Sequence, residues 1–443
     1  MRITFVVHQF PPRYFTGTEQ YALAVGCELQ RRGHDVDVFA LDPAFGEATG
    51  PWRESHEVVA GLPVRRINFW MNLGRDWARM EYRHPLLAEK FGAHLRARGT
   101  DVVHSFHLRH LGADLLDAAQ AQGRPVCVSL MDFWFLCPRV ILMRPDGSPC
   151  SGPPDGGRGC LPCHAPELAR QLAEHPVGDQ IAALSSTAAG CSKPAWDLRS
   201  KVASHHERWP YLQERLRRAE AVLAPTAFLR DVFVQNGIAA AQIRHCSYGI
   251  DTAGLAAGAA AARPASRPLT FGFFGSFAPH KAPHVLVEAM AKVRGDCRAL
   301  LRGRASDFPD YSGPLLAAAA RDPRITVQGP YERAQLAEVL GSIDVLVVPS
   351  TWHENAPFVV LEARAAGLPV LASRFGGLVE VVRDGVDGEL FAPGDGNALA
   401  ACLQRLVDEP DRLARYRAAV SPPKTLAAAV DEFEGVYRGV ARR

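Results

Sequence analysis

Two glutamates in the last third of the chain could bind sugar hydroxyls. Glu354 lies in the polar loop TWHENA, and Glu362 lies within the apolar run PFVVLEARAAG. A carboxylate accepts two hydrogen bonds, which suits the adjacent hydroxyls of a ribose or a hexose. In a helix that starts at Pro357, Glu362 lies roughly 7–8 Å along the axis at ~1.5 Å per residue, so the carboxylates would bracket a phosphate group. We therefore expect one glutamate for each sugar of a ligand.

The elements around these glutamates should create an anion site. The run DVLVVPS (344–350) is too short for a helix and indicates a buried parallel strand. Pro357 suits the first position of a helix, with Asn355 or Ala356 just before it, and the free N–H groups there favour a diphosphate. Lys281 also lies at a predicted helix start, where its charge opposes the helix dipole unless an anion is bound nearby.

Composition favours two globular domains and argues against a nucleic-acid partner. The chain has 443 residues, which is more than one hydrophobic core usually supports. It is 47% hydrophobic and 22% charged, as is typical of soluble globular proteins. The net charge of +3 is far from the strongly basic balance of a protein that binds a phosphate backbone.

Short apolar runs alternate with helical stretches in both halves of the chain, as in RITFVV and DVVHSF and again in LTFGFFGS and LPVLAS. This alternation predicts an α/β protein with two Rossmann-like, doubly wound parallel-sheet domains. The Ala/Gly/Pro-rich stretch 252–268 is the most linker-like segment. We expect domains at 1–250 and 268–424, and a C-terminal helix at 425–443 that packs back on the first domain. A ligand is expected between the domains, at the carboxyl ends of the strands.

The termini and the hydropathy pattern indicate a cytoplasmic protein. The N-terminus MRITFVVHQFPP has one arginine and a short apolar run ended by two prolines, so it lacks the features of a signal peptide. No apolar run approaches transmembrane length. The aromatic and basic segment 65–83 suits either peripheral contact with an anionic inner-membrane surface or an ordinary packing helix.

The segment ENAPFVVLEARAAGLPV resembles the E-x7-E signature of the family-4, GT-B-fold retaining glycosyltransferases. Further segments are similar to motifs of that family in the same order along almost the whole chain. They are TGTEQYALAVGCELQRRGHDVDVFAL, APTAFLRDVFVQNGI with YGID, FGSFAPHKAPHVLVEAM and GGLVEVVRDGVDGELFAPGD. The ordered match is far more specific than any single motif.

The resemblance implies transfer of a sugar, of the hexosyltransferase type, from a nucleotide diphosphate sugar to a glycan or lipid-linked acceptor in polysaccharide biosynthesis. It implies retention at the anomeric carbon. Lys281 would contact the donor diphosphate, Glu354 a hydroxyl of the donor sugar, and Glu362 the ribose. No catalytic metal is expected, because Lys281 supplies positive charge at the leaving group. The other donor-binding residues that the resemblance implies are Gly275, Ser276, Asn355, Ala356, Pro357 and Gly17.

Ser276 departs from the family pattern, which commonly has an arginine there to assist the lysine at the diphosphate. One cation is therefore missing or is supplied from elsewhere. Arg302 and Arg304, in the segment LRGRAS, are the candidates.

Met131 departs from the pattern on the side of the first domain, because the family usually has a histidine there. Asp132 or His104 would have to take over its role, and we treat Asp132 as a catalytic candidate. Gly17 is either part of a ligand loop or a turn glycine before a helix. The alternatives to a transferase are a GT-B-fold sugar-nucleotide epimerase and a non-catalytic scaffold that binds nucleotide sugars.

Four cysteines in a Gly/Pro-rich segment at about 137–163 suggest a structural zinc site. Cys160 and Cys163 form a C-x2-C pair, and Cys137 and Cys150 precede them. Four thiolates would make a closed tetrahedral site without an open position for catalysis. Free thiols are the alternative, since the first pair lacks tight spacing. The other cysteines lie mostly in apolar elements and are expected in the core: Cys27, Cys127, Cys191, Cys246, Cys297 and Cys402.

Overall fold

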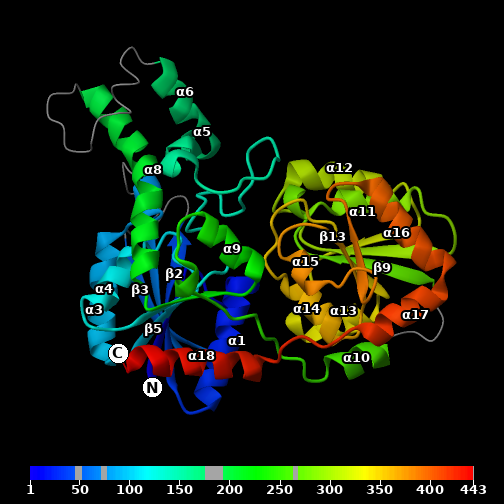
Figure 1. Ribbon diagram of the computed structural model, residues 1–443, viewed down its shortest axis with the longest axis horizontal. Helices are drawn as coiled ribbons and strands as arrows, with labels where there is room; N and C mark the ends of the chain where they lie inside the picture. Colours follow the sequence, from blue (N-terminus) through cyan, green and yellow to red (C-terminus); the bar gives the residue numbers. More distant parts are fainter. Residues whose placement is uncertain (45–51, 71–76, 175–192, 263–267, 443) are drawn as a thin grey trace. The chain divides into compact units, whose positions relative to one another are not determined.

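The computed structural model describes residues 1–44, 52–70, 77–174, 193–262 and 268–442 (Figure 1). The chain forms two compact units. Unit 1 comprises Met1–Pro225, Leu229–Cys246 and Ala429–Arg443, and unit 2 comprises Thr226–Phe228 and Ser247–Ala428.

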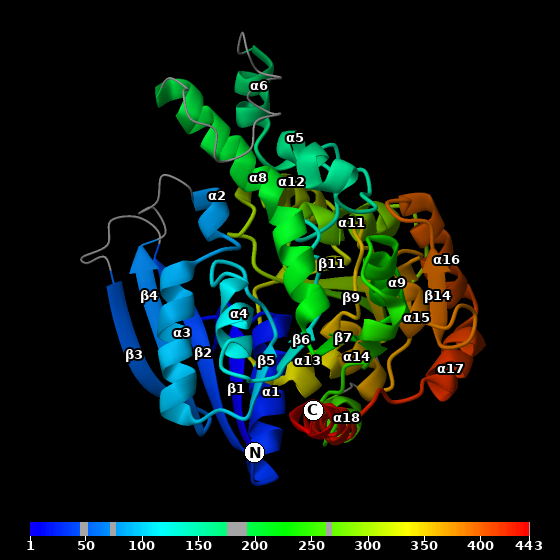
Figure 2. The same cartoon turned by 60° about the vertical axis from the view of Figure 1, so that its left-hand side comes forward.

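An eight-stranded sheet forms the centre of unit 1, and α3 and α4 lie across one of its faces (Figure 2). The strand order is β3-β4-β2-β1-β5-β6-β7-β8. The order reverses at β1, since β2 lies on one side of β1 and β5 on the other. The strands are β1 (Arg2–Val7), β2 (Asp35–Ala44), β3 (Trp52–Val59), β4 (Leu62–Trp70), β5 (Val102–Ser105), β6 (Val126–Ser129), β7 (Ala221–Ala224) and β8 (Ile243–His245).

One edge of this sheet is antiparallel. β3 and β4 pair as a hairpin, whereas the other described neighbours in the sheet run parallel. Ala60 and Gly61 form the two-residue turn with φ values of +50° and +88°. Two successive residues with positive φ match the twist of a tight hairpin. The expected parallel sheet therefore carries an antiparallel edge.

The C-terminal helix completes the core of unit 1. The hydroxyl of Tyr437 lies 2.6 Å from Nδ1 of His104 on β5, and the ring of Phe433 packs against that of Tyr21 on α1. The helices of this unit are α1 (Gly17–Arg31), α2 (Trp77–Met80), α3 (Pro85–Arg98), α4 (Asp114–Gln120), η1 (Pro154–Cys160), α5 (Leu161–His164), α6 (Pro166–Glu174), α8 (Lys193–Arg218), α9 (Ala227–Gln235), η2 (Ala240–Gln242) and α18 (Leu426–Ala441).

Unit 2 has a six-stranded parallel sheet with the order β11-β10-β9-β12-β13-β14. The strand order of this sheet reverses between β9 and β12. β10 lies on one side of β9, and β12 lies on the other side. The strands are β9 (Leu269–Phe274), β10 (Cys297–Arg302), β11 (Ile325–Gln328), β12 (Val345–Val348), β13 (Val370–Ser373) and β14 (Gly388–Phe391).

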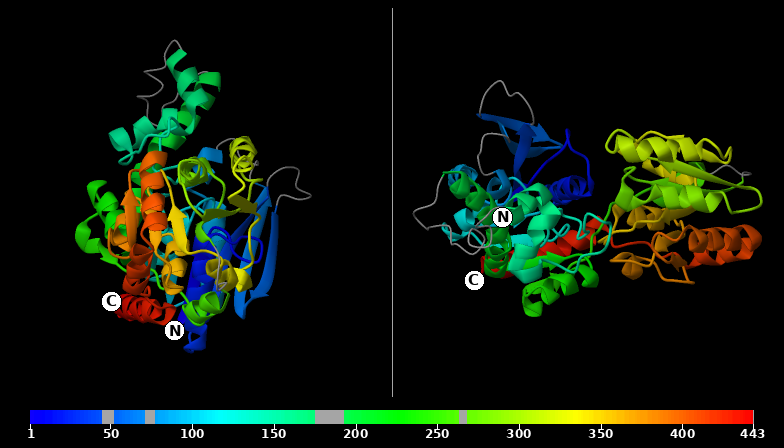
Figure 3. Two further views of the ribbon diagram at one scale, coloured as in Figure 1. Left: turned by 90° about the vertical axis from the view of Figure 1, so that its right-hand side faces the viewer. Right: turned by 90° about the horizontal axis from the view of Figure 1, so that it is seen from above.

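Helices cover both faces of the second sheet (Figure 3). Phe271 and Phe273 of β9 belong to the apolar cluster that includes α11 and α16, whereas Gly272 between them faces Ile343. Alternate residues of a strand point to opposite faces, so β9 is buried on both sides. The helices are α10 (Leu255–Ala262), η3 (Pro279–Lys281), α11 (Pro283–Met290), α12 (Pro309–Ala319), η4 (Arg333–Gln335), α13 (Leu336–Gly341), α14 (Phe358–Ala365), α15 (Leu378–Val381), α16 (Gly396–Asp408) and α17 (Pro410–Ala419).

Two segments differ from the sequence-based expectation. Residues 255–262 of the predicted linker form helix α10, because alanine has the highest helix propensity and dominates this stretch; residues 263–267 lie outside the described residues. The segment 65–83 is not one helix, since β4 ends at Trp70 and α2 begins at Trp77, with 71–76 outside the described residues. None of the described helices is both long and apolar enough to cross a membrane.

Candidate active site

Two loops leave the second sheet where its strand order reverses. Loop 275–282 follows β9, and loop 349–357 follows β12. Doubly wound sheets bind ligands at this position, outside the carboxyl ends of the strands. The backbone N–H of Thr351 donates to the carbonyl of His280 at 2.9 Å, which ties the two loops together.

Lys281 and Glu354 form an ion pair across these loops. Glu354 is 4% exposed, and its Oε1 accepts hydrogen bonds from Lys281 Nζ and from Ser350 Oγ, each at 2.7 Å. The ammonium group lies 4.8 Å from the centre of the Trp352 ring, whose face attracts a cation. Burial first, and then the charge of Lys281, lower the pKa of His280 to about 4. Lys281 therefore carries the positive charge of loop 275–282 at neutral pH.

Glu362 lies on α14 and is 8% exposed. Its Oε1 accepts a hydrogen bond from the guanidinium of Arg333, which lies on η4. Burial raises the pKa of Glu362, and the charge of Arg333 partly offsets this rise. Both predicted sugar-binding glutamates are therefore buried carboxylates, each paired with a cation.

The residues before α14 adopt a fixed loop. The helix begins at Phe358, and Pro357 is its N-cap with an extended backbone, so the prediction that Pro357 is the first helical residue is wrong by one position. The side chain of Asn355 accepts from Thr226 Oγ1 at 2.8 Å and donates to Tyr248 at 3.3 Å. Ala356 is buried. Asn355 thus holds the loop in place through its side chain.

Gly377 packs closely against the loop after β12, because it has no side chain. Its N–H donates to the carbonyl of Glu354 at 2.6 Å. A Cβ at Gly377 would lie 1.8 Å from the carbonyl oxygen of Asn355, so any other residue would displace this loop.

Gly275 and Ser276 follow β9 directly. The N–H of Gly275 donates to the carbonyl of Arg302 at 3.0 Å. Ser276 begins a turn in which its carbonyl accepts from Ala278 N–H at 2.9 Å. Of the two candidate replacement cations, Arg302 ends β10 beside this turn, whereas the side chain of Arg304 is 63% exposed.

In unit 1, Asp132 follows β6 and is held by two donors. Its Oδ1 accepts from the N–H of Trp134 at 2.8 Å, and its Oδ2 lies 2.9 Å from Nε2 of His107. The backbone N–H of Arg109 donates to Nδ1 of His107 at 3.2 Å. Because Nδ1 accepts, the proton of a neutral His107 lies on Nε2 and is donated to Asp132. His107 therefore orients the carboxylate and has no nitrogen left for a substrate.

His104 is part of the core and not of a binding surface. It is 0% exposed, and its two ring nitrogens lie 2.6 Å from Tyr437 Oη and 2.8 Å from Ser129 Oγ. Burial lowers the pKa of His104 to about 3, so the ring is neutral. The suggestion that His104 replaces the family histidine at Met131 is therefore wrong, because no substrate can reach it.

Gly17 is the first residue of α1. The polar residues Glu19, His8 and His107 were not predicted from the sequence as part of a site. Glu19, two residues on, is 0% exposed, and burial raises its pKa. Its Oε1 lies 3.5 Å from Nε2 of His8, and the His8 ring packs on His107 with centroids 4.1 Å apart. His8 and His107 follow β1 and β5, the strands where the order of the first sheet reverses, and that placement was the available signal.

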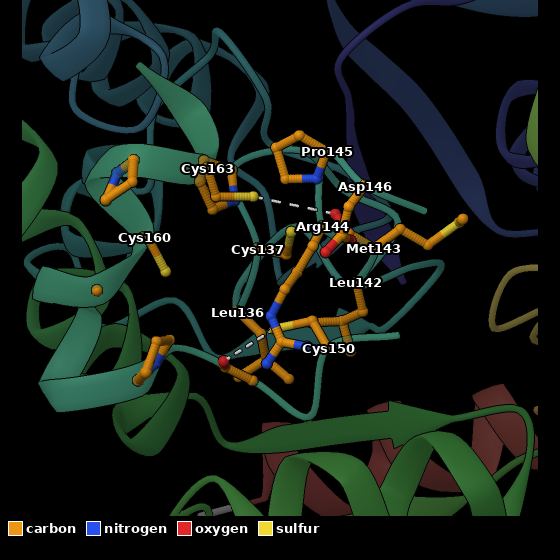
Figure 4. Close-up of a pocket in the computed structure, with 15 residues that line it drawn as sticks. Leu136, Cys137, Leu142, Met143, Arg144, Pro145, Asp146, Cys150, Cys160 and Cys163 are labelled. Carbon is orange, nitrogen blue, oxygen red and sulfur yellow. Dashed lines mark hydrogen bonds between the residues drawn. The ribbon is translucent and has the colours of Figure 1, made fainter. Parts of the chain in front are cut away.

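The four clustered cysteines line one cavity of about 380 Å³ in unit 1 (Figure 4). Burial, followed by the neighbouring thiols Cys137, Cys150 and Cys163, raises the pKa of Cys160 to about 12. Within the described ranges, however, no three His, Cys, Asp or Glu side chains are arranged to hold a metal ion. The structure therefore gives the zinc site no direct support, and it stays a prediction.

The remaining cysteines mostly lie in the core, as expected. Cys127, Cys246, Cys297 and Cys402 are buried. Cys27 is partly exposed on α1, and Cys191 lies outside the described residues.

Known structures place these two units in the GT-B class of folds. HepE from Anabaena, whose crystal structure contains UDP and glucose, aligns with a TM-score of 0.63 at 18% identity, over 100% of this chain and 98% of that one. Sucrose-phosphate synthase from Thermosynechococcus elongatus aligns with a TM-score of 0.63 at 19% identity, over 99% of this chain and 98% of that one. At such low identity the likeness concerns the fold alone.

The chain belongs to the group 1 glycosyltransferases. Residues 16–249 match the family model described as "Glycosyl transferase 4-like domain", and residues 268–409 match "Glycosyl transferases group 1". The D-inositol 3-phosphate glycosyltransferase of Stackebrandtia nassauensis is 34% identical over 186 residues, which are 39% of this chain and 42% of that protein. Its counterpart from Mycolicibacterium smegmatis is 35% identical over 170 residues, 37% of this chain and 39% of that protein. In these two matches, the chain spans less than half the length of each curated relative.

Proposed function

We propose that this chain transfers a hexose from a nucleotide diphosphate sugar to a glycan or lipid-linked acceptor, with retention at the anomeric carbon, in polysaccharide biosynthesis. The observation that carries the proposal is the Lys281–Glu354 ion pair at the carboxyl edge of the second sheet, followed by the buried Glu362 on α14. Family membership and the UDP and glucose bound by HepE support this donor class.

Lys281 would bind the donor diphosphate, with Gly275 and Ser276 of the same loop beside it. Glu354 would accept hydrogen bonds from the donor sugar, and Glu362 from the ribose, together with the backbone of Asn355 to Pro357. The two carboxylates already bond Lys281 and Arg333, and the donor's hydroxyl groups would add hydrogen bonds to them while the ion pairs are kept. Neither buried carboxylate is then left without a cation, which avoids the free-energy cost of an unpaired charge.

The slow chemical event is departure of the diphosphate, on which negative charge grows. A cation fixed before the reaction stabilises that charge without reorganisation. Lys281 is held by Glu354 and the Trp352 ring, and so is positioned before the donor arrives. We propose that this ammonium group takes the role a metal ion has elsewhere, and that catalysis is metal-independent.

In unit 1, Asp132 is the proposed catalytic group, and Gly17, at the start of α1, is the proposed ligand-binding glycine. Two donors fix the carboxylate of Asp132, and its side chain remains 21% exposed, so a substrate hydroxyl can reach it. We propose that the protein acts in the cytoplasm, with peripheral contact at the inner face of the membrane through the segment 65–83.

Transfer to an acceptor tests this proposal. The full chain is incubated with a panel of nucleotide diphosphate sugars and lipid-linked or glycan acceptors, and products are identified by mass spectrometry. We expect a glycosylated acceptor with wild type, and a loss of about 100-fold or more in Lys281→Ala and Glu354→Gln. Lys292→Ala is the matched control, because Lys292 bonds Asn397 on an exposed surface.

The same panel separates the alternatives. Interconversion of the free donor without transfer would indicate a sugar-nucleotide epimerase. Binding of a nucleotide diphosphate sugar without either reaction would indicate a scaffold, which the departures at Met131 and Ser276 favour. Full transfer activity in both active-site variants would contradict the proposed roles of Lys281 and Glu354.

A further inference from the structure

The proposed donor site in unit 2 has fewer cations in loop 275–282 than its ligand has negative charges. A nucleotide diphosphate sugar carries two negative charges on its diphosphate, and loop 275–282 supplies one cation, Lys281. Ser276 occupies the position next to Gly275 and has no charge. Among the described residues, four cations either pair with one of the two glutamates or lie at the end of β10 or just after it, and they differ in their partners: Lys281, Arg302, Arg304 and Arg333.

Three of these cations already have a carboxylate partner. Lys281 pairs with Glu354, and Arg333 pairs with Glu362. Arg304 is 63% exposed and lies 3.9 Å from Asp307, so water screens its charge.

Arg302 differs from the other three because it has no carboxylate partner among the residues that the structure describes. It is partly buried at the end of β10. Its Nε donates to the carbonyl of Gly329 at 3.3 Å, and its guanidinium lies 5.4 Å from the centre of the Tyr331 ring. A carbonyl and a ring face orient a guanidinium but do not neutralise it, so an anion is the missing partner.

The backbone of Arg302 lies next to the turn that contains Ser276, the position that lacks a cationic side chain. In the parallel pairing of β9 and β10, Arg302 lies opposite Phe274. Its carbonyl accepts from the N–H of Gly275, the residue just before Ser276, at 3.0 Å. The two backbones touch there, because a Cβ at Gly303 would lie 2.0 Å from the carbonyl oxygen of Gly275.

Tyr331 keeps the Arg302 side chain near this junction. Its ring packs edge-on against Phe274, with centroids 5.9 Å apart, while its face lies against Arg302. Since Nε is bonded to Gly329, the two terminal nitrogens remain for a ligand, in the fork geometry that suits phosphate oxygens.

We infer that Arg302 is the second cation of the diphosphate site, supplied by the neighbouring strand in place of an arginine at position 276. This inference rests on the proposed function, since it assigns a residue to the donor diphosphate. Arg302 and Lys281 together balance the two negative charges on the diphosphate of a nucleotide diphosphate sugar.

Binding of a nucleoside diphosphate tests the inference without an acceptor. Calorimetric titrations use UDP, GDP and ADP, and then the nucleoside that corresponds to the tightest of them. In Arg302→Gln we expect the diphosphate to bind about 10-fold or more weakly and the nucleoside to bind within about twofold of wild type. Arg302→Lys should keep part of the affinity. Arg304→Gln is the matched control and should bind like wild type.

Two results would overturn the inference while leaving the proposed function intact. One is unchanged diphosphate affinity in both Arg302 variants. The other is an equal loss for nucleoside and diphosphate in a variant whose thermal unfolding matches wild type, since that loss would show a role in shaping the pocket. If wild type binds none of the three diphosphates, the proposed function fails, and this inference fails with it.

Discussion

The Glu354 side chain is 5% exposed, whereas the Lys281 side chain that pairs with it is 25% exposed. Removing the lysine leaves a carboxylate buried with Ser350 as its remaining side-chain donor in the described residues. Removing the charge of Glu354 leaves an ammonium group that can turn towards water. The cost of breaking a buried pair is the cost of the charge left behind, so the two substitutions are not equivalent.

We therefore predict that Lys281→Met lowers the free energy of unfolding by about 2–3 kcal/mol, and Glu354→Gln by about 1 kcal/mol or less. Urea unfolding monitored by circular dichroism measures both. Transfer activity should be lost in both variants, so stability and activity separate. Equal destabilisation by the two substitutions would contradict the asymmetry of burial.

A second prediction at the residue scale concerns His107, which holds the carboxylate of Asp132. Its Nδ1 accepts from a backbone N–H and its Nε2 faces the carboxylate. We predict that His107→Phe lowers kcat by about tenfold or more while the donor KM, which the proposed function assigns to unit 2, stays within about twofold.

A double variant distinguishes positioning from direct contact. If His107 serves to orient Asp132, His107→Phe combined with Asp132→Asn should be no slower than Asp132→Asn alone. A full additional loss in the double variant would mean that His107 contacts the substrate independently.

The sequence singled out Glu354, Glu362 and Lys281 as candidates because their spacing relative to predicted strands and helix starts is local. It offered Arg302 only together with Arg304, and it did not single out His107. Their roles depend on which strand lies beside which, and on hydrogen bonds such as that from Gly275 to Arg302, which join residues far apart in the chain.

At the scale of elements, the cysteine segment is a long irregular part of unit 1. From Pro138 to Pro153 it has no helix or strand, and it is held by turns such as Cys137 C=O to Val140 N–H at 2.9 Å. Such a segment could turn its thiols inward around an ion. We predict about one zinc per chain in purified protein, measured by mass spectrometry of the metal content.

A matched pair of variants tests which cysteines bind the zinc. Replacing Cys160 and Cys163 with serine should remove the zinc, whereas Cys297→Ser in the buried β10 should not. Zinc well below one per chain in the wild type would rule the site out and leave free thiols, as the present arrangement of the side chains suggests.

Long or strongly apolar elements were predictable, and marginal ones were not. β9, β12 and β13 follow from buried apolar runs. β8 and β14 did not, because IRH and GELF are short and partly polar, and pairing with an adjacent strand decides their conformation. The start of α14 was misplaced by one residue, since proline tolerates both the cap and the first turn.

At the scale of the whole molecule, more of the described histidines with a strongly lowered pKa lie in unit 1 than in unit 2. Burial is the main cause that lowers the pKa of each, to about 3 for His104 and about 4 for His84, His110 and His205, all in unit 1. In unit 2, burial lowers the pKa of His280 to about 4. In the opposite direction, burial raises the pKa of Asp114 in unit 1 to about 6, and it also raises that of Glu19 in unit 1 and that of Glu362 in unit 2.

Unit 1 should therefore be the more acid-sensitive part of the chain. A histidine held neutral in the folded state contributes stability that is fully present above pH 6.5, the value near which the unfolded chain takes up protons. That contribution is lost as the pH falls from 6.5 towards 4, at about 1.4 kcal/mol per pH unit for each group. Asp114 and Glu19 offset at most two of these four histidines in unit 1 over part of this range, which still leaves a larger loss there than His280 causes in unit 2.

Hydrogen exchange of the full chain, followed by mass spectrometry and corrected for intrinsic rates, measures this difference. Between pH 7 and pH 5 we expect peptides from β5, β6 and α18 to lose protection before peptides from β9 and β12. Between pH 8 and pH 7 no change is expected, because these histidines are then largely neutral in both states. Earlier loss in unit 2, or simultaneous loss in both units, would contradict the prediction and would show that other groups, such as the paired carboxylates, dominate the acid response.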